Sequence, residues 1–334
     1  MYRPLKSTLA IASLVTLALV VSACARPRPP HLSSGGPSAA HGTLPGTGGA
    51  YFGAFSMPNG SGQAAETSSI EAEEHYLGRK LDIAHWFYSW NDAFPTWRES
   101  SDLAHGRIPM ISWGGTNTRA IVNGSQDNLI RARADGVRNL GQPVLLRWFW
   151  EMDGNTNAAE ANDPATFRAA WEHIVSLFRS RGANNAAFVW CPNAWGVETN
   201  RAQAFYPDPS TVDWICADGY NWYPNKPGSR WTSFEETFHD WYAWASTKGK
   251  PLMVGELGVQ EDPGSPDRKA QWIRDMATTL QTRMPAVRAV VYFDHRANSY
   301  SDPGISFDWT LASSSASHAA WRSVGLSSYF RPAH

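Results

Sequence analysis

The stretch PVLLRWFWEMDG at residues 143–154 decides the fold class, because it begins as an apolar strand and ends in charged residues. Strand alternation over 143–151 would place Arg147, Phe149 and Glu151 on one side. A buried Arg and Glu are costly unless they are paired or functional. We therefore expect a strand whose C-terminal end carries chemistry.

Seven further apolar segments match this one in length, and amphipathic segments separate them. The eight predicted strands are 51–57, 82–90, 108–113, 143–151, 186–193, 212–221, 251–258 and 286–295. Two intervening segments carry apolar residues at helical spacing, namely Trp171, Ile174, Val175 and Phe178 in one and Trp272, Met276 and Leu280 in the other. Helix starts are predicted at Asp163-Pro164, at Ser265-Pro266 and at Ser233, which has Glu236 three residues later.

Eight strand–helix units in residues 51–334 predict an α/β fold of the (β/α)8 or TIM-barrel type, with a single catalytic domain. An open doubly wound sheet is the alternative. That fold usually binds a nucleotide through a Gly-rich first turn, but neither GxGxxG nor GxxxxGK[ST] occurs. In a barrel, functional residues gather at the C-terminal strand ends.

The composition narrows the class of protein. The 29 basic residues nearly balance the 30 acidic ones, which argues against a nucleic-acid partner. With 43% hydrophobic residues, the chain can bury a large core. The 17 tryptophans raise the expectation of a carbohydrate or aromatic ligand, because the indole face stacks well on other rings.

The N-terminus resembles an export signal. Arg3 and Lys6 precede an apolar run over 9–21, and Val-Ser-Ala then leads to Cys24 as in a bacterial lipobox. We expect a lipoprotein signal peptide at 1–23 and a Pro/Gly/Ser-rich tether at 24–50 that begins at a lipidated Cys24. The predicted location is the outer face of a bacterial membrane, held by lipid alone, or the secreted space. An ordinary signal peptide is the alternative.

Acidic residues end three of the predicted strands. Glu151 ends the fourth, Asp218 and Tyr220 lie in the sixth, and Glu256 follows an apolar run in the seventh. Strands four and seven lie across a barrel from each other. Two carboxyl groups that flank a sugar ring can serve as proton donor and nucleophile in glycoside hydrolysis. The alternative is a buried ion network with Arg147.

These motifs resemble those of glycoside hydrolase family 26, a family of retaining barrel enzymes in clan A. The family shows Arg-x-x-His-Glu-Met-Asn-Gly, then Asp-x-Tyr, then a Glu-Phe-Gly-like segment. This chain has Arg147-x-x-Trp150-Glu151-Met152-Asp153-Gly154, Asp218-Gly219-Tyr220 and Gly255-Glu256-Leu257-Gly258. The resemblance covers most of 51–310 in order and spacing.

The resemblance implies a role for each matched residue. Glu151 would be the acid/base and Glu256 the nucleophile of a retaining endo-β-glycanase. Arg147 would hold a carboxylate in its ionised, oriented state. Tyr220 would hydrogen-bond the nucleophile, and Asp218 would line the site near the reacting sugar.

Trp150 replaces the family's usual His, and Asp153 replaces its Asn, and these two departures bear on the substrate more than on the reaction. Mannan is ranked first because it is the commonest substrate of the family. Mixed-linkage β-glucan and β-1,3-xylan are the alternatives, as are a transglycosylase and a non-catalytic glycan-binding lipoprotein.

Aromatic residues near the strand ends are candidate sugar platforms. We select Trp113, Trp222 and Tyr292, together with Trp150, as substrate-binding residues. Trp90 and Trp195 also lie near strand ends. Packing between barrel and helices is the alternative for each of these aromatic residues.

Other chemistries lack a motif. The histidines are scattered without HxH or HExxH, so no metal site is predicted, and no GxSxG elbow is present. We predict no cofactor and no protein partner. Cys191 and Cys216 are interpreted as small buried residues, with a disulfide as the alternative.

Overall fold

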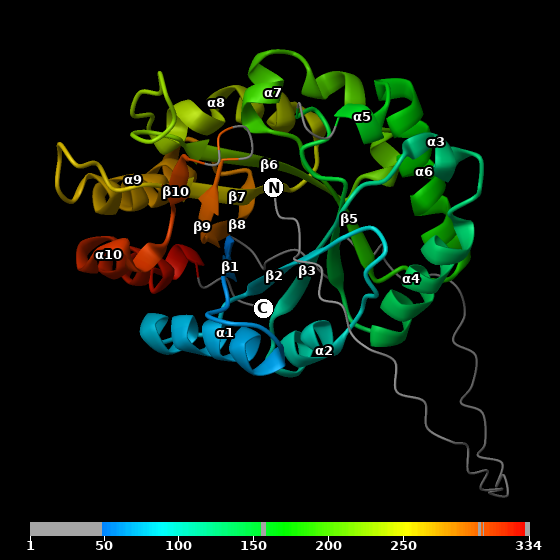
Figure 1. Ribbon diagram of the computed structural model, residues 1–334, viewed down its shortest axis with the longest axis horizontal. Coiled ribbons are helices and arrows are strands. Elements are labelled where there is room, and N and C mark those ends of the chain that lie inside the picture. The colour runs from blue at the N-terminus through cyan, green and yellow to red at the C-terminus, as the bar shows by residue number, and fades with distance from the viewer. Residues whose placement is uncertain (1–48, 155–157, 300–301, 303, 331–334) are drawn as a thin grey trace, which may run out of the picture. The chain divides into compact units, whose positions relative to one another are not determined.

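The computed structural model describes residues 49–154, 158–299, 302 and 304–330. The predicted signal peptide, Cys24 and nearly all of the predicted tether lie outside this part of the chain. Eight parallel strands close into a barrel in sequence order, with helices around it (Figure 1). The predicted (β/α)8 barrel is therefore confirmed.

All eight predicted strands are present. They are β1 (Tyr51–Ser56), β2 (Ile83–Tyr88), β3 (Ile108–Trp113), β4 (Val144–Trp148), β5 (Ala186–Trp190), β6 (Trp214–Asn221), β7 (Leu252–Val259) and β8 (Val287–Asp294). A short antiparallel pair, β9 (Arg296–Asn298) and β10 (Ser306–Asp308), follows the last barrel strand.

The helices cover the outside of the barrel. They are α1 (Gln63–Leu77), α2 (Trp97–Ala104), α3 (Thr118–Val122), α4 (Asp127–Leu140), α5 (Ala158–Ala161), α6 (Pro164–Ser180), α7 (Ala194–Glu198), α8 (Phe234–Ala245), α9 (Arg268–Thr282) and α10 (Ser315–Gly325). Short 3₁₀ turns are η2 (Ala202–Phe205), η3 (Pro209–Thr211), η4 (Ser246–Lys248), η5 (Leu311–Ser313) and η6 (Ser328–Phe330).

Helix starts follow the sequence signals at two of three places. Asp163 accepts a hydrogen bond from the Thr166 amide at the start of α6, and Ser233 forms a capping box with Glu236 at the start of α8. The start predicted at Ser265-Pro266 is wrong, because α9 begins at Arg268 after Asp267 takes a left-handed conformation.

Two clusters of buried apolar side chains pack against the barrel strands, one inside the barrel and one outside it. The interior is filled by one cluster of buried side chains, which includes Tyr51, Met110, Leu145, Trp214 and Met253. A larger cluster packs between strands and helices and takes up the predicted apolar faces of α6 and α9. The barrel is thus a packed core, and ligands can be reached only at its ends.

The end of β4 differs from the predicted strand. Regular structure stops at Trp148, and Phe149 and Glu151 have positive φ angles of 47° and 53°. The turn breaks the alternation, so Phe149 points outward and packs with Trp148 and Phe167. Its ring lies where a Cβ on Gly115 would come within 2.4 Å, so only glycine fits at that position.

Both described ends of the chain meet at the base of the barrel. The Ala50 amide, just before β1, donates to the Tyr329 carbonyl at 3.0 Å, and Ala50 is fully buried. Arg79 donates to the carbonyl of Gly325 at 3.0 Å and also to that of Phe330. The strands start at this end, so it is opposite the end where they finish.

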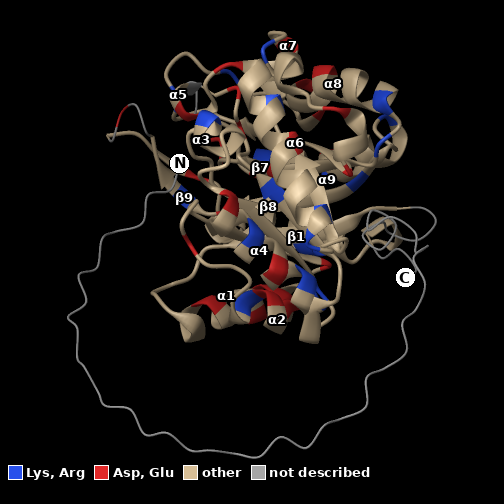
Figure 2. Ribbon diagram, turned by 90° about the vertical axis from the view of Figure 1, so that its right-hand side faces the viewer, with Lys and Arg blue, Asp and Glu red and all other residues tan. Residues whose placement is uncertain are grey.

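The outer surface carries charges of both signs close together. Figure 2 shows Asp and Glu on α1 and α2, with Lys and Arg close by. Arg107 joins these helices through ion pairs with Glu74 at 2.6 Å and Asp102 at 3.2 Å. Among the described helices, none combines the length and apolar character that crossing a bilayer requires.

Candidate active site

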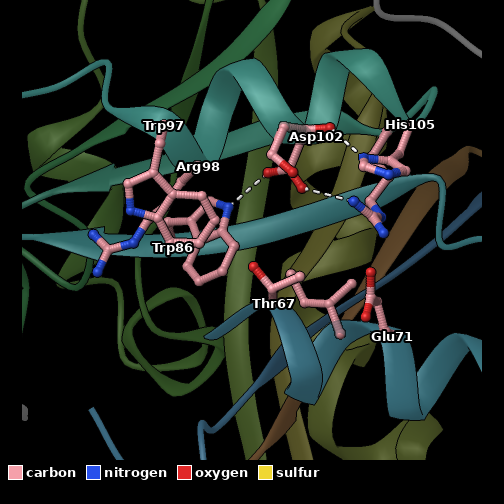
Figure 3. Close-up of a pocket in the computed structure, with 10 residues that line it drawn as sticks. Thr67, Glu71, Trp86, Trp97, Arg98, Asp102 and His105 are labelled. Atoms are coloured by element: carbon pink, nitrogen blue, oxygen red, sulfur yellow. Dashed lines mark hydrogen bonds and ion pairs between the residues drawn. The ribbon is translucent and has the colours of Figure 1, made fainter. Parts of the chain in front are cut away.

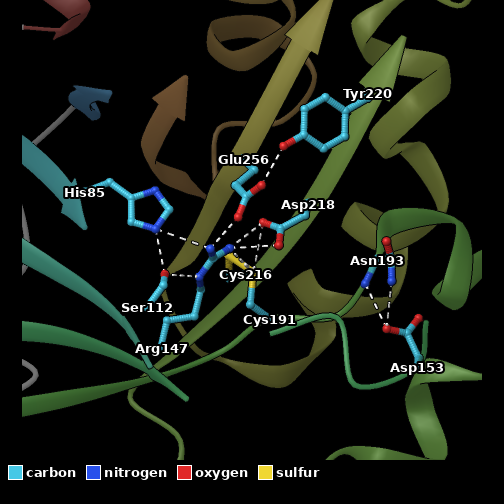
Figure 4. A network of polar contacts seen from close by, with 10 residues as sticks. All are labelled: His85, Ser112, Arg147, Asp153, Cys191, Asn193, Cys216, Asp218, Tyr220 and Glu256. Carbon is cyan, nitrogen blue, oxygen red and sulfur yellow. Dashed lines mark hydrogen bonds and ion pairs between the residues drawn. A yellow bond between two sulfur atoms is a disulfide. The ribbon is translucent and has the colours of Figure 1, made fainter. Parts of the chain in front are cut away.

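A buried arginine lies at the centre of the C-terminal end of the barrel (Figure 4). Arg147 lies on β4, and its side chain is fully buried. One terminal nitrogen donates to both oxygens of Asp218 from β6, at 2.7 and 2.8 Å. The other donates to Glu256 from β7. The structure thus brings together three of the residues that the sequence singled out.

Two residues that sequence reasoning missed complete the setting of Arg147. Its Nε donates to the Ser112 hydroxyl of β3 at 2.7 Å, and its Nη2 lies 3.2 Å from Nε2 of His85 on β2. Burial, and then the charge of Arg147, holds the pKa of His85 well below its usual value. Because the guanidinium group of Arg147 has only donors, Nε2 of neutral His85 is the acceptor in this contact. Their parity with Arg147 across neighbouring strands could have pointed to both residues.

Glu256 is held between two donors. Arg147 donates to Oε1 and the Tyr220 hydroxyl donates to Oε2. Burial and the neighbouring carboxylate raise the pKa of Tyr220 well above its usual value, so the phenol keeps the proton that it donates. Such charge-assisted contacts fix the orientation of a carboxylate. The predicted contact of Tyr220 with Glu256 is present.

Glu151 differs from Glu256 in its electrostatic setting. Its half-buried side chain lies near the other acids, and one oxygen each of Glu151, Asp218 and Glu256 fall within 4.8 Å of one another. Desolvation, followed by the negative charges of Glu256 and Asp153, raises the pKa of Glu151 to about 8. Glu151 therefore keeps a proton near neutral pH. One proton donor thus faces one oriented carboxylate.

Asp218 is the third acid of the cluster. Burial raises the pKa of its carboxyl group, and the contact with Arg147 opposes that rise. The same three acids have oxygens close enough to share a cation, and the sulfur atoms of Cys191 and Cys216 lie equally close to an Asp218 oxygen. Arg147 already supplies the positive charge there. Cys191 and Cys216 are joined in a disulfide, so the alternative interpretation of these cysteines is the one found.

Two of the predicted sugar platforms are wrong. Trp113 is fully buried, stacks on Trp90 at 4.3 Å between ring centroids, and donates to its carbonyl. Tyr292 is also fully buried, and its hydroxyl donates to the Trp309 carbonyl at 2.9 Å. Neither ring reaches the mouth of the barrel. Both side chains belong to the apolar cluster that packs between the strands and the helices.

The other two predicted platforms lie at the mouth. Trp150 is half-buried, with the Arg147 guanidinium 5.2 Å from its ring centroid and Phe87 at 5.3 Å. Trp222 is half-buried and packs on Tyr220 at 5.3 Å between centroids. Both are placed for contact with a ligand, and their role in binding stays a prediction.

A cleft of about 600 Å3 runs outward from Asp218 and Tyr220, between the segments that follow β5 and β6. Its aromatic walls are Trp222 and Trp195, and Trp195 is 38% exposed. Ligand pockets commonly have volumes of about 300–1,000 Å3. Trp195 is thus a better candidate platform than Trp113 or Tyr292, although sequence position alone did not separate these residues.

A second pocket lies away from the mouth, between α1 and α2 (Figure 3). Its volume of about 10 Å3 has room for a single water molecule. Trp86 donates to Asp102 at 2.6 Å, and Arg98 lies 5.2 Å from the Trp86 ring centroid. These contacts hold α2 against the barrel and offer no space for a substrate.

Several known proteins are similar to this chain in sequence or in fold. No protein-family model matches the chain. The sequence is 31% identical over 273 residues to Endoglucanase H of Acetivibrio thermocellus, which covers 78% of this chain and 29% of that protein. It is 28% identical over 144 residues to the beta-1,3-xylanase TXYA of a Vibrio species, which covers 41% of this chain and 27% of that protein. The chain thus spans less than a third of the length of these curated relatives.

Solved structures share the barrel. A GH26 β-mannanase from Bacteroides ovatus matches with a TM-score of 0.59 and 14% identity, over 87% of this chain and 91% of that one. An endo-β-1,4-mannanase of Cellulomonas fimi matches with a TM-score of 0.58 and 17% identity, over 84% of this chain and 71% of that one. The chain is a relative of glycoside hydrolases. The shared barrel confirms the fold that the resemblance to family 26 implies, and the sequence relationship to the endoglucanase supports that resemblance.

Replacing Arg147 by Met should destabilise the fold, because Asp218 and Glu256 would lose their buried cation. The expected loss in the free energy of unfolding is about 3–5 kcal/mol at pH 7. Burial already raises the pKa of Asp218, and without Arg147 the main opposing effect would be lost. The folded state would then bind more protons, so the loss should grow as pH rises.

Urea denaturation at pH 5 and pH 8 measures this difference. Arg230→Met is the matched control, since Arg230 forms an exposed ion pair with Glu236 at 3.0 Å and should change stability by less than about 1 kcal/mol. A loss in Arg147→Met that is as small as in the control, or equal at both pH values, would contradict the assigned charge balance.

Proposed function

We propose that this protein is a retaining β-glycanase that cleaves internal bonds of a β-linked polysaccharide. The observation that carries the proposal is the pairing of Glu151 with Glu256, whose oxygens lie within 4.8 Å. Retaining enzymes hold their two carboxyl groups at about 5–5.5 Å, whereas inverting enzymes need about 6.5–9.5 Å to admit a water molecule. The short separation supports double displacement.

The first step follows from the two electrostatic settings. Glu256 attacks the anomeric carbon through the carboxylate that Arg147 and Tyr220 orient, and the bond from that carbon to the leaving oxygen breaks. Glu151 gives its proton to the leaving oxygen. The product of this step is a glycosyl ester on Glu256 and an ionised Glu151.

The second step reverses these roles. Ionised Glu151 takes a proton from a water molecule, whose oxygen attacks the anomeric carbon and releases Glu256. The sugar leaves with its original configuration. A sugar hydroxyl in place of water would give transglycosylation with the same residues.

For the substrate, we propose a β-glucan ahead of mannan. Glucose and xylose carry an equatorial 2-hydroxyl, whereas that of mannose is axial and projects from the ring. Trp150 offers an apolar face next to Glu151, where a hydrogen-bonding imidazole would suit a projecting hydroxyl. The name of the relative Endoglucanase H, at 31% identity, supports a glucan. The solved mannanases support mannan as the second candidate.

For location, we propose export and lipid attachment at Cys24. The basic residues, the apolar run and the lipobox-like Val-Ser-Ala before Cys24 support it. The Cys191–Cys216 disulfide also fits an oxidising compartment.

Metabolic labelling with a fatty-acid analogue in a bacterial host should mark the full chain. The label should disappear in Cys24→Ala, because the acylated thiol is lost. Equal labelling of both forms, or no label in either, would contradict the lipid anchor.

Incubation of the full chain with barley β-glucan, lichenan, mannan and β-1,3-xylan should release oligosaccharides, most from the glucans. Glu256→Ala should reduce turnover by at least about 10⁴-fold while leaving glycan binding intact. Glu151→Ala should slow polysaccharide cleavage by about 10²–10⁴-fold, but should affect far less the glycosylation of Glu256 by dinitrophenyl glycosides, whose leaving group needs no proton.

Product analysis by mass spectrometry and proton NMR decides between the alternatives. Retained configuration and lost activity in Glu256→Ala support the proposal. Binding without any product from wild type would indicate a glycan-binding protein. Asp240→Ala, on the far wall of the cleft, is the control for general effects of losing an acid there.

Trp150→His tests the choice of sugar. An imidazole would restore a hydrogen-bonding group beside Glu151, so the ratio of kcat/KM for mannan to that for glucan should rise by about tenfold or more. Trp222→His, at a wall of the cleft that Trp150 does not line, should leave this ratio within about threefold. An unchanged ratio in Trp150→His would remove this position from the specificity account.

A further inference from the structure

The backbone at Glu151 is held in an unusual conformation. Glu151 has φ 53°, and Phe149 two residues earlier has φ 47°. A residue other than glycine is strained in this left-handed region and stays there only when its surroundings fix it. The turn at residues 149–154 therefore needs external contacts to present Glu151 at the mouth.

Backbone hydrogen bonds fix part of this turn. The Phe149 amide donates to the Trp113 carbonyl at 2.9 Å, and the Glu151 amide donates to the Cys191 carbonyl at 2.8 Å. The Gly154 amide closes the turn on the Glu151 carbonyl at 2.9 Å. These bonds tie the turn to β3 and to the segment after β5.

Asp153 adds a side-chain contact to the segment after β5. Its Oδ1 accepts hydrogen bonds from the backbone amide of Asn193 at 3.0 Å and from the Asn193 side-chain amide at 3.2 Å (Figure 4). The segment is fixed in turn, because the Asp218 amide donates to the Pro192 carbonyl at 3.0 Å. Asp153 thus connects the Glu151 turn to the strand that carries Asp218.

The carboxyl group of Asp153 is closely enclosed. Asp153 is 1% exposed, and no described group forms a hydrogen bond with its Oδ2. A Cβ on Gly196 would lie 1.6 Å from this oxygen, so the neighbouring helix α7 leaves room for a carboxyl group only because residue 196 is glycine. A surface acid would need no such fit. The surrounding charges are Glu151 on the same turn, Asp218 on β6 and Arg201 after α7.

We propose that Asp153 is a positioning residue for Glu151: its clamp on Asn193 holds the turn in the left-handed conformation that aims Glu151 at the leaving oxygen. This inference rests on the proposed acid/base role of Glu151. Asp153 itself touches no substrate. Burial raises the pKa of Asp153, and the hydrogen bonds from Asn193 oppose that rise.

Kinetics on two kinds of substrate test the proposal. Asp153→Ala removes the clamp and should lower kcat/KM for the polysaccharide by about tenfold or more, since misplacing a general acid forfeits part of its contribution. For dinitrophenyl glycosides, whose leaving group needs no proton, the loss under pre-steady-state conditions should stay below about threefold. Asp153→Asn keeps an oxygen acceptor for Asn193 and should restore polysaccharide cleavage to within about threefold of wild type. Equal loss on both substrates in Asp153→Ala, or no rescue by Asp153→Asn, would overturn the proposal.

Crystal structures of wild type, Asp153→Ala and Asp153→Asn test the same point without activity. Glu151 should leave its left-handed conformation in the Ala variant and keep it in the Asn variant. An unmoved Glu151 in Asp153→Ala would overturn the proposal. If Asp153→Ala does not fold, Asn193→Ala removes the side-chain half of the clamp and should give the same selective loss in smaller measure, whereas a non-selective loss would contradict the clamp.

Asp163→Ala is the matched control for losing an acid nearby, because Asp163 caps α6 from an exposed position and should alter neither substrate ratio nor Glu151 geometry. The two proposals fail in distinguishable ways. A wild-type protein that cleaves no glycan and no aryl glycoside would remove the proposed function, while the crystal comparison would still decide whether Asp153 positions residue 151.

Discussion

The buried guanidinium of Arg147 is the interaction on which the mouth of the barrel depends. It lies in full burial and directs its donors to Ser112, Asp218 and Glu256, which come from three different strands. A buried charge is stable only when it is matched and fully hydrogen-bonded. Arg147 thereby fixes how the ends of β3, β4, β6 and β7 lie relative to one another. The same contacts with Arg147 orient the carboxyl groups of Asp218 and Glu256. Its influence on Glu151 is smaller than that of desolvation, and Glu151 holds its proton.

The strand ends could be predicted because two constraints agree there. An apolar run predicts a buried strand, and a charged residue at its C-terminal end marks the open face of a barrel. Arg147, Asp218, Tyr220 and Glu256 follow this rule, and the structure brings them together. The prediction for Phe149 failed because alternation holds only within a strand, and β4 stops at Trp148. No sequence period describes a turn with two positive φ angles.

The aromatic residues show what sequence pattern leaves undetermined. Tryptophan suits a core and a sugar platform equally well, since both use its apolar face. Trp113 and Tyr292 fill the core, whereas Trp195 borders the cleft. The difference depends on the path of the segments after β5 and β6, which contain short helices and irregular turns. Ser112 and His85 were missed for another reason, because a hydroxyl or an imidazole acquires its role only from the neighbouring Arg147.

Ala50 contacts Tyr329 at the base of the barrel, and this contact determines where further segments can be joined to the described domain. Both ends of the described chain leave from the face where the strands begin, and the cleft opens on the face where they finish. A segment joined at either described end would therefore start from the face opposite the cleft. A long polymer could reach the cleft without passing the points where the described chain ends.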